Sequence, residues 1–138
     1  MITTGKYPSL RLRRGRSEDW IRRMLKENTL SANDLILPIF IVSGKNKKIP
    51  IKSMPGVFRY SLDKLNSIVQ KAILLKIPMI ALFPCVDNKY KDSFGSEALN
   101  KNNLVCTATR KIKKIFKNQI GIMCDVALDP YTSHGHDG

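Results

Sequence analysis

Two apolar runs decide the fold: LILPIFIV at residues 35–42 and MIALFPCV at residues 79–86. Both are apolar throughout, which is typical of parallel-sheet strands that are covered on both faces. Residues 120–128 predict a third strand of this kind. Amphipathic stretches over 62–76 and 103–117 separate the runs and predict helices. This alternation of strand and helix predicts an α/β fold built from right-handed βαβ units.

Two architectures satisfy that alternation: a small doubly wound sheet, and the opening part of a (β/α)8 barrel, which needs roughly 250 residues. A doubly wound dinucleotide-binding sheet has a glycine-rich turn directly after its first strand. Here Ser43-Gly44-Lys45 follows the first strand, with one glycine and then a lysine run. The sequence therefore argues against a dinucleotide site. Between the first strand and the first helix, residues 49–60 carry the turn signal Met54-Pro55-Gly56 and predict a small hairpin.

Residues 1–34 predict an N-terminal arm, which leaves residues 35–138 for the α/β part. Ser17 is expected to cap a short helix whose buried side carries Trp20 and Met24-Leu25. Ser31 to Asp34 fits a second capping box.

The charge balance favours an anionic partner. Twenty-four Lys and Arg residues against 11 Asp and Glu give a formal charge of +13, which suits nucleic acid, a membrane surface or a small carboxylate or phosphate substrate. The three cysteines, Cys85, Cys106 and Cys124, form no disulfide or CxxC pattern and indicate a reducing compartment. No apolar run approaches the roughly 20 residues of a membrane span. A cytoplasmic protein without a secretory signal is expected.

The chemistry of the chain is concentrated in CDVALDPYTSHGHDG at residues 124–138. If the third strand continues through residue 128, Asp125, Ala127 and Asp129 project from the same face. Carboxylates at the C-terminal end of a parallel strand lie where α/β barrels place their reaction centres. Carboxylate oxygens suit Mg²⁺, and added histidine would suit Zn²⁺ or Fe²⁺.

Gly135 would let Asp137 and the pair His134/His136 fold back toward those aspartates. A plainer interpretation stands beside this one. Asp-Pro-Tyr-Thr-Ser from Asp129 is also a good turn sequence, and His-Gly-His is often a solvated loop. Spacing alone leaves the functional site and the turn open.

Residues 125–138 closely resemble the signature of the 5-aminolevulinate dehydratase (porphobilinogen synthase) family. Further motifs that resemble the family occur in the expected order and spacing along the chain. They are Arg11-Leu-Arg-Arg14 with Trp20, the first strand, Ser53-Met-Pro-Gly with Arg59, Leu82-Phe-Pro84, Lys91-Asp92, Gly95-Ser-Glu-Ala98 and Asn103-Leu-Val105.

The resemblance implies a hydro-lyase of tetrapyrrole (haem) biosynthesis, which condenses two molecules of 5-aminolevulinate into porphobilinogen with loss of water. It also implies a (β/α)8 TIM barrel, a homo-octamer held through N-terminal arms, and lysines that bind both substrates as Schiff bases. The chain would then comprise the arm and the first three βα units of an incomplete barrel. Because the family's Schiff-base lysines fall beyond Gly138, this fragment is expected to be inactive alone.

Zinc-dependent members of that family carry three cysteines in this loop, at the positions of Ala127, Asp129 and Asp137. Without those thiolates no active-site zinc is expected. The resemblance is to the aspartate-rich branch, which uses Mg²⁺ with its main site outside this chain. It places Asp125, Asp129 and Asp137 at the active-site mouth. Asp129 and Asp137, with His136 as a further candidate, could hold a hydrated cation or the substrate amine.

Two other hypotheses were weighed. Basic clusters over 11–23 and 110–117 could track phosphates of a nucleic acid, but few aromatic side chains lie between them to stack on bases. Alternatively, the chain is a remnant that docks on a full-length dehydratase through its arm. The dehydratase hypothesis is preferred because its motifs extend along the whole chain.

Overall fold

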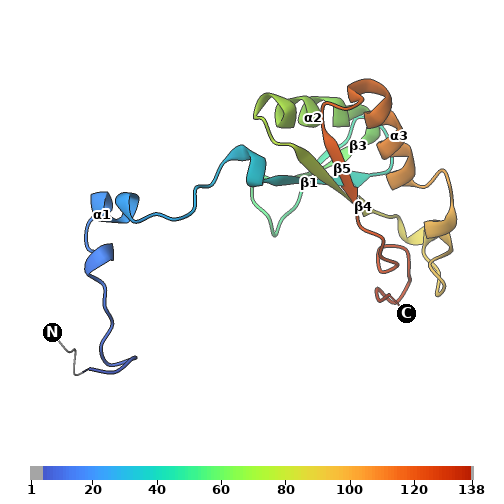
Figure 1. Cartoon of the computed structure of the whole chain (residues 1–138). Coiled ribbons are helices and arrows are strands. Elements are labelled where there is room, and N and C mark those ends of the chain that lie inside the picture. The colour runs from blue at the N-terminus through green and yellow to red at the C-terminus, as the bar shows by residue number, and fades with distance from the viewer. Residues whose placement is uncertain (1–4, 138) are drawn as a thin grey trace. The chain divides into compact units, whose positions relative to one another are not determined.

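The computed structural model describes residues 5–137, which belong to two compact units, one ending at Leu30 and the other beginning at Ser31. Figure 1 follows the chain from the N-terminal unit, drawn in blue, into the second unit, which contains the sheet. In the described part of the chain, no helix has the length and apolar character that a membrane crossing requires.

The N-terminal unit contains one 3-10 turn, η1 (Arg14–Arg16), and one short helix, α1 (Asp19–Met24). Ser17 does not cap α1 as predicted, because its hydroxyl donates to the carbonyl of Arg14 at 3.0 Å and closes η1 instead. The predicted buried side is also wrong: Trp20 is 59% exposed, and Met24 and Leu25 are 75% and 57% exposed. A six-residue helix presents less than two turns, which is too little surface to bury these side chains within its own unit.

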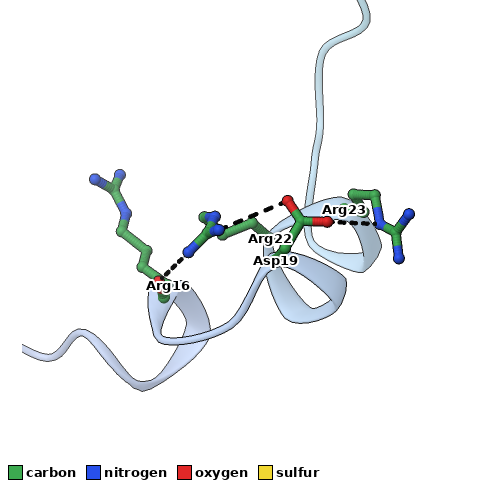
Figure 2. A network of polar contacts seen from close by, with 4 residues as sticks. All are labelled: Arg16, Asp19, Arg22 and Arg23. Carbon is green, nitrogen blue, oxygen red and sulfur yellow. Dashed lines mark hydrogen bonds and ion pairs between the residues drawn. The ribbon is translucent and has the colours of Figure 1, made fainter.

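Because no core packs against α1, ion pairs and a hydrogen bond stabilise it (Figure 2). Asp19 forms ion pairs with Arg22 at 3.6 Å and with Arg23 at 3.2 Å. Arg22 also donates to the carbonyl of Arg16 at 2.9 Å, which links α1 to η1. All of these side chains are exposed, so each pair adds at most about 1 kcal/mol.

The second unit is a five-stranded sheet with strand order β2-β3-β1-β4-β5. Strand β1 pairs in parallel with β3 and β4, β4 pairs in parallel with β5, and β2 pairs antiparallel with β3. The predicted hairpin is therefore confirmed as β2 and β3, and β3 additionally extends the parallel sheet. The strands are β1 (Ile36–Val42), β2 (Lys48–Pro50), β3 (Phe58–Ser61), β4 (Met79–Cys85) and β5 (Gly121–Cys124).

Two α-helices connect the parallel strands, α2 (Leu65–Leu74) between β3 and β4 and α3 (Leu104–Phe116) between β4 and β5. Short 3-10 turns complete the unit. They are η2 (Ala32–Asp34), η3 (Leu62–Lys64), η4 (Asn88–Tyr90) and η5 (Ser96–Leu99). The capping box predicted from Ser31 to Asp34 is confirmed, and it starts the single turn η2.

Both α-helices pack on the same face of the sheet. Alternate residues of β1 and β4 point toward them, and the registers place Ile39 beside Leu82 and Leu37 beside Ile80. The other face of the sheet has no helix on it in residues 5–137. Within residues 5–137 these apolar strands are thus covered on one face, and Ile36, on the helix-free face, is 46% exposed. The core comprises Ile39, Ile41, Leu65, Val69, Ala72, Ile80, Leu82, Ala108, Ile112, Phe116 and Ile120.

Two details of the helices concern Ser61 and Ile115. Ser61 makes no capping bond to the helix that follows. Its buried hydroxyl accepts the N–H of Lys47 at 2.8 Å and donates to Asp63 at 2.7 Å, so it ties the β1–β2 connection to η3. In α3, Ile115 is 44% exposed, because it lies one step outside the buried stripe of Ala108, Ile112 and Phe116.

Candidate active site

The third parallel strand ends earlier than the sequence predicts. Strand β5 stops at Cys124, which pairs with Leu82, whereas the prediction extended it to residue 128. The chain turns instead at Leu128, whose carbonyl accepts the N–H of Tyr131 at 2.8 Å and of Thr132 at 3.1 Å. The prediction that residues 125, 127 and 129 share one strand face is therefore wrong, because the strand ends before them. The alternative interpretation of Asp-Pro-Tyr-Thr as a turn describes the chain from Asp129 onward.

Asp137 closes this turn. Its Oδ1 atom accepts the backbone N–H of Leu128 at 2.6 Å and of Asp129 at 2.9 Å. One carboxylate oxygen thus binds two consecutive amides, in the manner of an anion held by a backbone nest. The sequence prediction that Asp137 folds back toward Asp129 is correct in geometry, although the contact is with the backbone and not with the carboxylate.

Thr132 holds the same loop from within. It is 3% exposed, and its hydroxyl lies 2.9 Å from the carbonyl oxygen of His136 and 3.3 Å from that of Asp129. A single hydroxyl proton is therefore shared between two carbonyl groups that face each other across the loop. No pattern in the sequence singles out this threonine.

The loop also packs on the segment that follows β4. Thr132 forms an isolated parallel bridge with Asp92, and the N–H of Ser133 donates to the carbonyl of Asp92 at 2.8 Å. Gly95 lies against this junction with φ +66°, and a Cβ there would meet the side chains of Thr132 and Leu128 at 3.4 and 3.5 Å. These are ordinary van der Waals contacts, so it is the left-handed backbone conformation that favours glycine at this junction.

Asp92 organises its own segment through its carboxylate. Oδ1 accepts the N–H of Phe94 at 2.9 Å and of Ser96 at 3.0 Å. The hydrogen bond from the Ser96 amide, followed by the Ser96 side chain, lowers the pKa of Asp92 below its ordinary value. Sequence reasoning noted Asp92 only as part of a motif. The signal that could have identified its role is the Asp-Ser-Phe-Gly order, which is typical of a side chain that caps its own turn.

The two histidines are connected to each other and to the neighbouring segment. Nδ1 of His134 accepts the N–H of His136 at 3.3 Å, and Nε2 of His134 lies 3.3 Å from the carbonyl of Ser93. An acceptor role for Nδ1 requires the proton on Nε2, which can then donate to Ser93, so the neutral Nε2–H tautomer satisfies both contacts. A cavity of about 400 Å³ opens beside His134, and Asn88 and Lys91 line its other side.

The predicted site residues therefore fall into two groups. Asp137 and the backbone of Asp129 are brought together, whereas Asp125 directly follows β5 and is exposed. Within residues 5–137, neither Asp125 nor Asp129 uses its carboxylate in a hydrogen bond or ion pair of the protein. No group of three or more His, Cys, Asp and Glu side chains in this described range is arranged to hold a metal ion. The side chain of Ala127 offers no ligand atom.

Comparison with known proteins shows the family of this chain. Residues 9–138 match the family model described as delta-aminolevulinic acid dehydratase. A delta-aminolevulinic acid dehydratase of Bradyrhizobium diazoefficiens is 55% identical over 130 residues, which cover 94% of this chain and 36% of that protein. One of Chlamydia pneumoniae is 42% identical, over 94% of this chain and 39% of its own length.

A solved structure supports the fold. The crystal structure of delta-aminolevulinic acid dehydratase (porphobilinogen synthase) from Toxoplasma gondii, in complex with the reaction product porphobilinogen, superimposes with a TM-score of 0.82. It is 36% identical in sequence, and the match covers 94% of this chain and 36% of that one. The chain thus spans less than half the length of each of these three relatives. On the match over residues 9–138, the chain belongs to the delta-aminolevulinic acid dehydratase family.

Proposed function

We propose that this chain supplies the N-terminal arm and the first βα units of a porphobilinogen synthase, a hydro-lyase of tetrapyrrole (haem) biosynthesis. The enzyme condenses two molecules of 5-aminolevulinate into porphobilinogen with loss of water. The observation that carries the proposal is the family match over residues 9–138, together with a loop of the family's sequence at the C-terminal end of the parallel strand β5.

Catalysis in this proposal needs barrel strands beyond those described. None of the lysines in this chain lies in a motif that resembles the family's Schiff-base lysines. The helix-free face of the sheet carries the ring pair Phe40 and Phe83, with centroids 5.7 Å apart, and Met123, which is 43% exposed. In a closed barrel, inward side chains from the remaining strands would cover such a face. The isolated chain should therefore form no porphobilinogen.

The aspartates receive separate roles in the proposal. Asp137 shapes the loop through two backbone amides, which leaves its second carboxylate oxygen for a ligand. Asp125 and Asp129 face solvent and can orient the substrate amine or hold a hydrated cation. His136 is a further candidate ligand, since its ring stacks beside that of His134 at 6.0 Å and is not held by the loop.

Oxygen-rich chemistry favours Mg²⁺ over zinc for any ion at this loop. Two carboxylates and an alanine stand where zinc-dependent relatives would have thiolates, and hard oxygen donors suit Mg²⁺. When bound, the ion would supply positive charge that helps to position the substrate. We place the main magnesium site of the enzyme outside this chain.

A cytoplasmic homo-octamer completes the proposal. The N-terminal unit has two short turns of helix, exposed Trp20 and a cluster of arginines, which suits a segment that contacts a neighbouring subunit. Such contacts would bury the apolar side chains that the unit itself leaves exposed.

A chimeric enzyme tests this function. Residues 9–138 would replace the matching segment of the Bradyrhizobium diazoefficiens enzyme, and porphobilinogen would be measured colorimetrically with Mg²⁺ or Zn²⁺ after chelation. We expect turnover that Mg²⁺ supports and Zn²⁺ does not restore, and no product from the isolated chain. The unchanged relative serves as the control for assay and metal. A soluble, folded chimera that makes no porphobilinogen would contradict the proposal.

A further inference from the structure

A second polar cavity lies outside the candidate active site. Its volume is about 480 Å³, and it shares no residue with the loop over 125–137. The hairpin strands, η3 and α2 together form its wall. Its polar lining consists of Asn46, Lys48, Tyr60, Lys64, Ser67 and Lys71.

Three lysines from three elements converge on this cavity. Lys64 ends η3 and Lys71 lies in the last turns of α2, seven residues later, so both lie on one helical stripe with Ile68 between them. Lys48 comes from β2, where it pairs with Tyr60 on the helix-covered face of the sheet. Lys48 lies apart from the other two lysines in the sequence, and the three come together only because the chain folds back through the hairpin.

The hairpin side of the cavity is held in a defined position. The Lys48 ammonium lies 4.4 Å from the ring centroid of Phe58, a cation–π contact that restricts this long side chain. Fully buried Ser61 fixes the start of the hairpin through its bond with the N–H of Lys47. The Lys48 side chain is therefore held by contacts within the hairpin that borders the cavity.

Only one carboxylate among the described residues, that of Asp63, lies near these amines. No acidic side chain lines the cavity, and in residues 31–137 no ion pair occurs. Asp63 precedes Lys64, but its carboxylate is occupied by the N–H of Asn46 at 3.1 and 3.0 Å and by the hydroxyl of Ser61 at 2.7 Å. The positive charge of Lys64 therefore lies near one carboxylate, whereas Lys48 and Lys71 have no acidic partner in the described residues.

We propose that this cavity binds a phosphate group. A phosphate carries about −1.5 to −2 charges at neutral pH and several acceptor oxygens, which matches three ammonium groups better than a single carboxylate does. The side-chain amide of Asn46 and the Tyr60 hydroxyl are neutral donors in the lining, and Ile68 adds an apolar side chain. Ser67 contributes no donor, since its hydroxyl donates to the carbonyl of Lys64 at 3.0 Å.

An NMR titration of the full chain tests the site. Amide spectra would be recorded with inorganic phosphate, with glycerol 3-phosphate, and with sodium chloride at matched ionic strength. We expect saturable shifts at Asn46, Tyr60 and Ser67 with both phosphate compounds and none with chloride. Tighter binding of the monoester would identify a phosphorylated metabolite as the ligand, and equal binding would identify the free anion.

Charge-matched variants separate the site from general basicity. The double variant Lys64→Gln/Lys71→Gln should weaken phosphate binding by at least about tenfold. Lys101→Gln/Lys114→Gln removes the same charge outside the cavity and should change the affinity by less than about twofold. Equal weakening in both variants, or shifts that never saturate, would overturn the proposal. Retained dispersion of the amide spectrum checks that each variant is folded.

Discussion

Asp137 provides the sharpest test of how the candidate loop is built. Its Oδ1 atom accepts the N–H groups of Leu128 and Asp129, so Asp137→Ala removes both bonds at once. Each bond contributes about 1 kcal/mol net at an exposed position, which gives about 2 kcal/mol for the closed loop. Since 1.4 kcal/mol corresponds to a factor of ten, hydrogen exchange at these two amides should accelerate roughly thirtyfold.

The assay is amide hydrogen exchange followed by NMR on the full chain. Exchange at Ile80 and Ile112, two fully buried core residues, reports the global stability and should stay within about twofold of the unchanged chain. Asp137→Asn keeps an acceptor oxygen in the same place, so exchange at Leu128 and Asp129 should change by less than about fivefold. Unaltered exchange in Asp137→Ala would refute this account of the loop.

The same pair of variants separates loop closure from chemistry. In the chimeric enzyme, Asp137→Asn preserves the closed loop but removes the charge that a cation or substrate amine would need. If Asp137→Asn keeps the loop closed but abolishes turnover, the negative charge of Asp137 is itself needed for the reaction. Full turnover in Asp137→Asn would reduce the role of this residue to closing the loop.

Three further predictions concern the scaffold. Ile112→Ala should lower the free energy of unfolding by about 3 kcal/mol in urea titrations, whereas Ile115→Ala, at a position 44% exposed on the same helix, should cost less than about 1 kcal/mol. Asn103→Ala removes the side-chain acceptor for the Cys106 N–H at the start of α3 and should cost about 1 kcal/mol, while Asn103→Ser should restore most of it. The folded-state pKa of Asp92 is lowered, so the stability that its charged form contributes is present above the ordinary carboxyl pKa near 4 and is lost as the pH falls through the lower folded value. Protection of the amides near Asp92 against hydrogen exchange should therefore fall in that pH range. Asp92→Asn should abolish this pH dependence.

The parallel sheet could be predicted because its signal is local. The apolar runs of β1 and β4 and the amphipathic period of α3 each specify an element within a few residues. The end of β5 could not be predicted in this way, since Val126 and Ala127 continue the apolar pattern. The strand ends because Asp137, thirteen residues beyond Cys124, binds the turn at Leu128.

The residues of the candidate site could be predicted from the sequence more fully than their arrangement in space. The sequence singled out Asp125, Asp129 and Asp137, but it also placed 125 and 129 on one strand face, which the turn prevents. Asp92 and Thr132 were missed because their importance arises from contact between two loops about forty residues apart in the chain. Such a contact has no signature in either segment alone.

The hydrogen bonds divide the aspartates of these two loops by function. Asp92 and Asp137 each use a carboxylate oxygen to bind two backbone N–H groups, and these bonds fix the shape of the loops after β4 and β5. Asp125 and Asp129 make no such bond within residues 5–137, and both are exposed. A carboxylate that is already bound by amides has less capacity to change partners during a reaction than one that faces solvent. The chemistry proposed for this loop therefore falls first to Asp125 and Asp129, and Asp137 serves it by placing the backbone of Asp129.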